Sequence, residues 1–174
     1  MTIDPNQPYK LLIVDDEKDL LETLKDEFEA AGVECLTATG GREALAIVVA
    51  KAPDAILSDI NMPNMDGITM LAEIRRIGHE PPLVFLTAYG DKDKAVQALR
   101  LGAADFHDKP FNRKALKASV LQALEYGRSL KSLESELNDL SATIPPDSRE
   151  TFRELKRALL LTRKSRETYF KKAS

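Results

Sequence analysis

Short apolar runs alternate with helical patterns over the first 123 residues, and this alternation most limits the possible folds. Apolar runs of strand length occupy residues 9–14, 33–38, 54–59, 82–88 and 104–108. Segments with apolar residues at helical spacing occupy residues 19–32, 41–51, 66–78, 91–103 and a long stretch from 112. Five rounds of strand and helix predict an α/β fold with a five-stranded parallel, doubly wound sheet that is covered by helices on both faces.

Polar or charged residues lie at the ends of most of these apolar runs or directly after them. Asp15 and Asp16 follow the first run, Asp59 ends the third, Thr87 lies near the end of the fourth, and Lys109 follows the fifth. Ligands of open parallel sheets bind beyond the carboxyl ends of the strands. We therefore expect these five residues to be neighbours at one edge of the sheet, although they are scattered along the chain.

A cluster of three aspartates needs a cation. Two carboxylates about 5 Å apart repel by roughly 3 kcal/mol at an effective dielectric near 20. Mg²⁺, which binds to one or two carboxylates, waters and phosphate oxygens, would reverse the sign of this interaction. Lys109 adds a second positive charge, and Pro110 restricts the backbone after it, with a cis peptide bond as one way to do so. Thr87 offers a hydroxyl donor.

These groups are typical of a phosphoryl-transfer site. The chain has no G-x-x-x-x-G-K-[ST] phosphate loop, which argues against ATP as the direct donor. The nucleophile is then expected to be an aspartate that attacks an already activated phosphoryl group. Asp59 is the best candidate because it stands alone at the end of the middle run, whereas Asp15 and Asp16 stand together as metal ligands. Lys109 would be the counter-charge of the acyl phosphate.

Each of these residues, taken singly, also has an ordinary structural explanation. Asp16 could cap the first helix, Thr87 could be a strand threonine, and Lys109 could be a solvated lysine. Their joint placement at strand ends carries the functional interpretation. Asp91 and Asn112 are further candidate helix caps.

Residues 9–126 resemble the receiver domain of two-component response regulators, which implies a flavodoxin-like fold. The resemblance rests on "VDDE", "SDINMP", "DG", "LTA" and "KPF", which occur in the order and spacing of that family. It implies that Asp59 accepts a phosphoryl group from a sensor histidine kinase or a phosphotransfer protein. It also implies that Asp15, Asp16 and Asp59 hold Mg²⁺, with the backbone carbonyl of Asn61 as a further ligand.

The same resemblance implies a conformational switch. Thr87 would move to bond the phosphoryl oxygen, and Phe106 would turn inward with it; a purely structural role in the core is the alternative for Phe106. Ala88 matches the small residue that leaves the phosphate accessible. Asn61 and Tyr89 match the positions that tune dephosphorylation. A receiver of this kind is a signalling phosphoacceptor that catalyses only its own phosphorylation and dephosphorylation.

The charge of the chain indicates a second part. Residues 1–123 carry a net charge of −6 and residues 124–174 a net charge of +3. We expect a leader at 1–8, a receiver at 9–126 and a helical extension at 127–174. Apolar residues from Leu116 to Ile144 recur at heptad-like spacing with one short step, so the last receiver helix should continue until "IPPD" at 144–147.

A second helix is expected after this break, because apolar residues keep the helical period between Phe152 and Thr162. This second helix is basic and the helix before it is acidic, which predicts that the two pair in a helical hairpin or a coiled coil. We expect the extension to form a homodimer or to dock on a downstream protein. A DNA-binding regulator that uses Arg163, Lys164 and Arg166 is the less favoured alternative, and a solvated face explains the charges without any partner. Two further interpretations are possible. The chain could be a scaffold whose receiver is never phosphorylated, or it could be the receiver part of a longer protein with a separate output domain.

The cysteine count and the distribution of apolar residues bear on where the protein is found in the cell. The one cysteine, Cys35, excludes a disulfide within the chain and fits a reducing compartment. The first residues lack an apolar signal region, and no run approaches the ~18 apolar residues of a membrane helix. We expect a cytoplasmic protein without a membrane span.

Overall fold

The computed structural model describes residues 7–88, 92–143, 145–148, 150 and 154. The chain divides into two compact units, Met1–Arg128 and Ser129–Ser174. The first unit contains the whole sheet. Among the described residues, no helix is both long enough and apolar enough to cross a membrane.

Five parallel strands form one sheet in the order β2-β1-β3-β4-β5, as the alternation of patterns predicts. The strands are β1 (Lys10–Val14), β2 (Glu34–Ala38), β3 (Ala55–Asp59), β4 (Leu83–Ala88) and β5 (Asp105–Lys109). The helices are α1 (Lys18–Glu29), α2 (Gly41–Lys51), α3 (Gly67–Arg76), α4 (Lys92–Arg100) and α5 (Arg113–Thr143), with a short 3₁₀ helix at Pro146–Ser148. The predicted parallel, doubly wound fold is confirmed.

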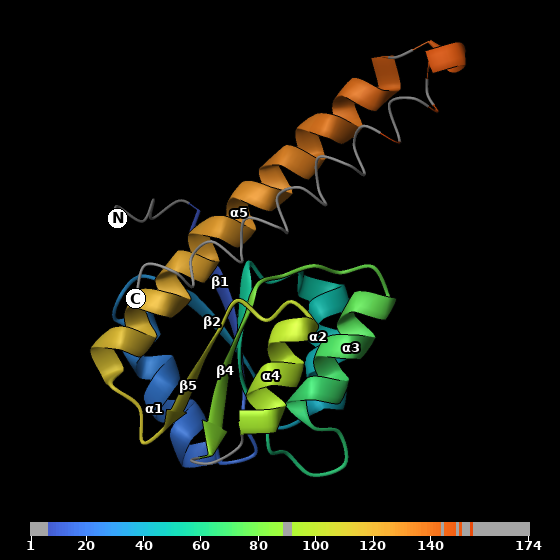
Figure 1. Cartoon of the computed structure of the whole chain (residues 1–174). Helices are drawn as coiled ribbons and strands as arrows, with labels where there is room; N and C mark the ends of the chain where they lie inside the picture. Colours follow the sequence, from blue (N-terminus) through green and yellow to red (C-terminus); the bar gives the residue numbers. More distant parts are fainter. Residues whose placement is uncertain (1–6, 89–91, 144, 149, 151–153, 155–174) are drawn as a thin grey trace. The chain divides into compact units, whose positions relative to one another are not determined.

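Helices cover both faces of the sheet, with α2, α3 and α4 on one side and α1 and the start of α5 on the other (Figure 1). The cores match this division. On one face, Leu12, Ile56 and Phe85 from the strands pack in a cluster with residues of α2, α3 and α4. On the other face, Ile13 and Leu57 pack with residues of α1 and α5. Successive strand residues thus enter opposite cores, which is why the strands read as unbroken apolar runs.

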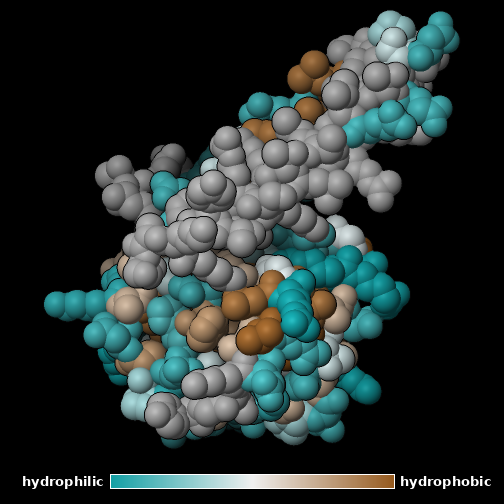
Figure 2. All heavy atoms as spheres, viewed as in Figure 1, coloured by the Kyte–Doolittle hydropathy of each residue, from teal (hydrophilic) through white to brown (hydrophobic). Residues whose placement is uncertain are grey.

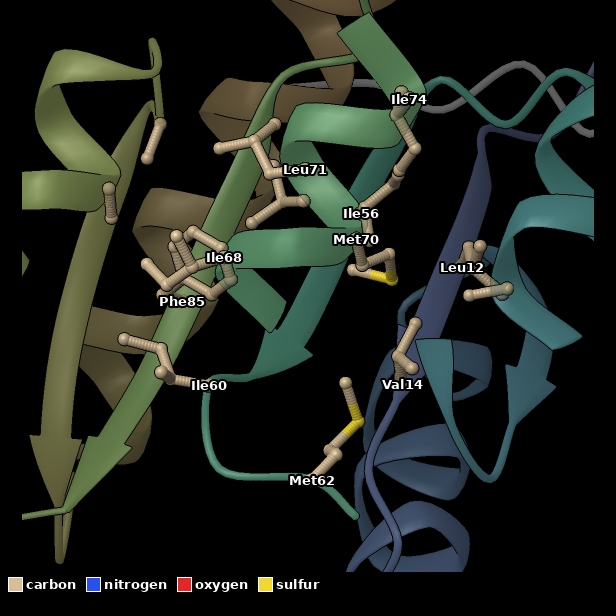
Figure 3. Packing of buried hydrophobic residues seen from close by; sticks show 14 of the residues in the cluster. Leu12, Val14, Ile56, Ile60, Met62, Ile68, Met70, Leu71, Ile74 and Phe85 are labelled. Atoms are coloured by element: carbon tan, nitrogen blue, oxygen red, sulfur yellow. The ribbon is translucent and has the colours of Figure 1, made fainter. Parts of the chain in front are cut away.

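Figure 3 shows the first of these cores from close by. Met70, Leu71 and Ile74 of α3 are fully buried against Ile56 of β3 and Phe85 of β4. This packing holds α3 directly beside the two central strands. The loop that joins β3 to α3 is therefore fixed at both of its ends.

Helix ends differ slightly from the sequence expectations. The predicted segments 19–32 and 66–78 both end on a glycine, whereas α1 ends at Glu29 and α3 at Arg76. Gly32 and Gly78 follow these helices with φ of 82° and 85°. Asn112 does cap α5, because its Oδ1 accepts the N–H of Ala115 at 3.1 Å. Asp91 lies outside the described residues.

The last helix passes the predicted end of the receiver at 126 and continues to Thr143. The expected continuation of this helix up to "IPPD" is therefore confirmed. Ile144 and nearly all of the predicted second helix lie outside the described residues, which include only Glu150 and Glu154 of that part of the chain. The hairpin, the coiled coil and the basic face therefore stay predictions.

Candidate functional site

Two carboxylates and one ammonium meet at the carboxyl edge of the sheet. Asp15 follows β1 and Asp59 ends β3, and these strands are adjacent. Lys109 ends β5, which lies beyond β4 from β3. Its Nζ atom is 3.0 Å from Oδ2 of Asp15 and 3.2 Å from Oδ1 of Asp59. A side chain as long as lysine is needed because the ammonium must reach across β4.

Both carboxylates are buried and fully engaged. Asp15 is 1% exposed and Asp59 6% exposed. The second oxygen of each accepts a backbone N–H: Oδ1 of Asp15 from Glu17 at 2.9 Å, and Oδ2 of Asp59 from Asn61 at 3.1 Å. Each carboxylate thus has one oxygen on an amide of the following loop and the other on Lys109. Buried charges persist in proteins when they are paired and hydrogen-bonded in this way.

The charges at this edge are incompletely balanced. Burial raises the pKa of Asp59, and the negative charge of Asp15 raises it further, while Lys109 and the Asn61 N–H lower it only in part. Burial lowers the pKa of Lys109, but its hydrogen bond to Asp15 and the charges of both carboxylates outweigh this and raise it overall. The site holds a stable ammonium and an Asp59 carboxylate whose ionised form would gain from a further cation.

The donor chemistry at this edge suits Mg²⁺, which prefers carboxylate and carbonyl oxygens and keeps several waters. Asp15 and Asp59 lie together there, as the positions of their strands predict. Asp16, the third predicted ligand, is exposed. Within the described part of the chain, no three His, Cys, Asp or Glu side chains are grouped closely enough to hold a metal ion by themselves. The fit therefore rests on the two buried carboxylates, and the remaining ligands would come from the exposed Asp16, carbonyl groups and waters.

Asp16 does not cap the first helix. The N-cap of α1 is Glu17, and no side-chain hydrogen bond caps it. The structural alternative for Asp16 is therefore wrong.

The start of α3 packs tightly on Asp59. Asp66 caps this helix through its Oδ1, which accepts the N–H of Thr69 at 2.7 Å. At Gly67, an added Cβ would lie 2.5 Å from the carbonyl oxygen of Asp59 and 2.7 Å from the ring of Phe85. Only glycine allows the helix this close, so the "DG" pair holds the backbone that carries Asp59.

Three other predicted residues lie on β4 and β5. Thr87 is buried, and its hydroxyl donates to the carbonyl of Ala88 at 3.3 Å. Ala88 is exposed and is in register with Lys109 on the neighbouring strand. Phe106, on β5, is 36% exposed, so its ring lies partly outside the core. Tyr89 lies outside the described residues.

Two further details belong to the predicted positions. The Lys109–Pro110 peptide bond is cis, which is the form that the sequence suggests as one way to restrict the backbone there. The side-chain Oδ1 of Asn61 accepts a hydrogen bond from Nζ of Lys94, in the first turn of α4. Sequence reasoning missed Lys94, because "DKDKAVQALR" has no pattern that singles out one lysine from the others.

Comparisons with known proteins match the part of the chain that forms the sheet. The family model described as "Response regulator receiver domain" matches residues 11–121. The chain is 40% identical over 131 residues to the regulatory protein AtoC of Escherichia coli, which covers 75% of this chain and 28% of AtoC. It is 38% identical over 114 residues to the DNA-binding transcriptional regulator NtrC of Salmonella typhimurium, which covers 66% of this chain and 24% of NtrC.

Solved structures give the same result for the fold. The response regulator receiver domain protein from Clostridium thermocellum superposes with a TM-score of 0.66 at 31% identity, which covers 70% of this chain and 98% of that one. The chain therefore spans whole receiver domains, but less than a third of the length of the two curated relatives named above.

Proposed function

The chain belongs to the response regulator receiver domain family, and on that premise we propose that Asp59 is the residue that accepts the phosphoryl group. The observation that carries this proposal is the position of Lys109, whose Nζ lies 3.2 Å from Oδ1 of Asp59 and 3.0 Å from Oδ2 of Asp15. A fixed cation at this place offsets negative charge that develops when a carboxylate receives a phosphoryl group.

In the proposed reaction, an Asp59 oxygen attacks the phosphorus of a phosphohistidine. The source is a sensor histidine kinase or a phosphotransfer protein. A P–O bond to Asp59 forms, the P–N bond breaks, and the imidazole leaves with the electron pair and takes up a proton. Bound Mg²⁺ would neutralise charge on the phosphoryl oxygens, held by Asp15, Asp16, Asp59 and the backbone carbonyl of Asn61. The domain would act as an enzyme only on its own phosphorylation and dephosphorylation.

The proposed output is a change of surface. Thr87 would bond the phosphoryl oxygen, with Ala88 leaving room for it, and Phe106 would turn inward. Figure 2 shows apolar residues gathered over α4 and β5, where Val96 and Phe106 are 48% and 36% exposed. Withdrawal of Phe106 would change this apolar face, which is how a local charge event can bias association with a partner.

The target of this change follows from the last helix. Because α5 begins in the receiver and continues to Thr143, we propose that the state of Asp59 biases either association of the helical extension in a homodimer or docking of a downstream protein. Nucleic acid is the second candidate partner, since NtrC is described as a DNA-binding regulator and residues 149–174 are basic. We place the protein in the cytoplasm, where histidine kinases present their phosphohistidine.

Phosphoryl transfer tests the proposal directly. The full chain is incubated with a phosphorylated histidine kinase or with phosphoramidate in Mg²⁺, and base-labile phosphate on the protein is measured. Wild type and Asp108→Asn, which neutralises an exposed aspartate on β5, should be labelled equally. Asp59→Asn should carry no label, and equal labelling of this variant would sink the assignment.

A further inference from the structure

Lys94 ties helix α4 to the loop that follows the candidate phosphoacceptor. Its Nζ donates a hydrogen bond to Oδ1 of Asn61, 33 residues away in the sequence. Lys94 is the third residue of α4 and is half-buried. A cation in the first turn of a helix is weakly unfavourable because of the helix dipole. The position of Lys94 in the first turn of α4 therefore does not by itself favour a lysine.

Asn61 in turn contacts Asp59. Its backbone N–H donates to Oδ2 of Asp59 at 3.1 Å. An ammonium can only donate hydrogen bonds, so the partner of Lys94 on the amide must be the oxygen. The contact thus fixes the orientation of the Asn61 side chain, with Oδ1 toward α4 and its NH₂ group turned away from Lys94.

This orientation matters for hydrolysis of an aspartyl phosphate. In that step the oxygen of a water attacks phosphorus and the P–O bond to Asp59 breaks. The carboxylate leaves with the electron pair, and the proton of the water passes to the departing phosphate. A nearby hydrogen-bond acceptor speeds such a step when it accepts an O–H of the water and aims the lone pair of that water at phosphorus. Oδ1 of Asn61 is an acceptor of this kind, two residues after Asp59.

We propose that Lys94 is a positioning residue that slows dephosphorylation, because it occupies Oδ1 of Asn61 and withdraws this oxygen from the attacking water. The proposal rests on Asp59 as the phosphoacceptor. An ammonium polarises the oxygen it binds and weakens its remaining capacity to accept. Loss of Lys94 should therefore release the acceptor and shorten the lifetime of the acyl phosphate, by up to about tenfold for one hydrogen bond to a charged group.

The lifetime of the phosphorylated chain tests this inference. The full chain is phosphorylated with phosphoramidate in Mg²⁺, the donor is removed, and release of inorganic phosphate is followed. The Lys94→Met variant removes the donor, Lys94→Gln keeps a neutral donor, and Lys94→Arg keeps a charged one. We expect the lifetime to fall from wild type and Lys94→Arg through Lys94→Gln to Lys94→Met. Lys114→Met, which removes an exposed lysine of α5, should keep the wild-type lifetime.

A double-variant comparison separates this role from a structural one. In an Asn61→Ala background there is no acceptor to release, so adding Lys94→Met should leave the lifetime unchanged. Two outcomes would overturn the role of Lys94 without touching that of Asp59. One is equal lifetimes of Lys94→Met and wild type, and the other is an equal effect of Lys94→Met with and without Asn61. Failure of the wild-type chain to take up phosphate at Asp59 would instead refute the proposed function on which this inference rests.

Discussion

The ammonium of Lys109 lies 3.2 Å from Oδ1 of Asp59, although the two residues are 50 positions apart in the sequence and strand β4 lies between their strands. The two residues end β5 and β3, and both strands run in the same direction. The same ammonium contacts Asp15 at 3.0 Å. One lysine therefore compensates two buried carboxylates, which leaves the edge of the sheet short of positive charge.

This shortage predicts that Asp59→Asn stabilises the protein in the absence of Mg²⁺. Because the pKa of Asp59 is raised in the folded state, the folded protein binds this proton more tightly than the unfolded chain, and ionising Asp59 lowers the free energy of unfolding. The penalty is complete above the folded pKa and disappears as pH falls below the ordinary value of 3.8. Asn61→Ala, which keeps both carboxylates and the backbone N–H, is the control.

We expect Asp59→Asn to raise the free energy of unfolding near neutral pH, where the ionised carboxylate of wild type carries its full penalty. The difference from wild type should shrink as pH is lowered toward 3.8. Urea unfolding in chelator over this range measures it. A variant less stable than wild type at neutral pH would show that the Lys109 attraction, and not burial, dominates at Asp59.

Magnesium should stabilise the folded protein through the carboxylates. We expect Mg²⁺ to raise the Tm of wild type in a concentration-dependent way, because a ligand that binds only the folded state stabilises it by mass action. The rise should be lost in Asp15→Asn and reduced in Asp16→Asn. Glu22→Gln, at an exposed position of α1, should respond as wild type does.

Asp16 makes this experiment informative, because its side chain is exposed while Asp15 is buried beside Lys109. An unchanged response of Asp16→Asn would remove Asp16 from the proposed ligands. An unchanged response of Asp15→Asn would contradict a metal site at this edge.

Gly127 allows α5 to pass over the start of β3. An added Cβ would lie 1.7 Å from the carbonyl oxygen of Asp54 and 2.8 Å from its carbonyl carbon. Because the obstacle is backbone, Gly127→Ala should displace α5 and destabilise the receiver by about 1–3 kcal/mol or more. Gly40→Ala is the control, since nothing lies within 4 Å of its Cβ position. Thermal unfolding measures both, and similar Tm values for the two variants would contradict the close contact.

Arg128 anchors the segment before β1. Its guanidinium lies 3.9 Å from the ring centroid of Tyr9 and donates to the carbonyls of Gln7 and Pro8, each at 2.6 Å. It also donates to Oδ2 of the buried Asp54 at 2.9 Å. The planar guanidinium contacts four groups at once, and the single ammonium of a lysine cannot make all of these contacts.

We therefore expect Arg128→Ala to lower the free energy of unfolding by about 1–3 kcal/mol, and Arg128→Lys to lower it by a smaller amount. Arg113 is the matched control: its side chain is 65% exposed and its contact with Glu27 is 3.4 Å long, so Arg113→Ala should change stability by at most about 0.5 kcal/mol. Denaturant unfolding gives both values. Equal effects of Arg128→Ala and Arg113→Ala would show that the buried contact contributes nothing.

The sequence predicts the sheet and the edge of the site because both follow from where strands end. Once Asp15, Asp59 and Lys109 are placed at the carboxyl ends of parallel strands, their meeting depends only on topology and side-chain length. Contacts such as Lys94 with Asn61 depend on the exact rotation of α4 against a loop. No periodicity records that rotation, so these contacts could not be foreseen.

The same limit explains the other details. The packing of Gly127 on Asp54 depends on the distance between a helix and the turn before a strand, which the pattern of α5 does not contain. The exposure of Asp16, next to the buried Asp15, depends on how the chain turns between β1 and α1. Alternation predicts that these segments are neighbours, but not which atoms touch.

The assignment of Asp59 is tested most directly by chemical trapping of the phosphorylated carboxylate. The full chain is phosphorylated with phosphoramidate in Mg²⁺ and treated with borohydride, which reduces an acyl phosphate to the alcohol. Peptide mass spectrometry then locates the reduced residue. We expect it at position 59 alone, and in no peptide of Asp59→Asn. Reduction at Asp15, Asp16 or another carboxylate of wild type would contradict the identification of Asp59 as the phosphoacceptor.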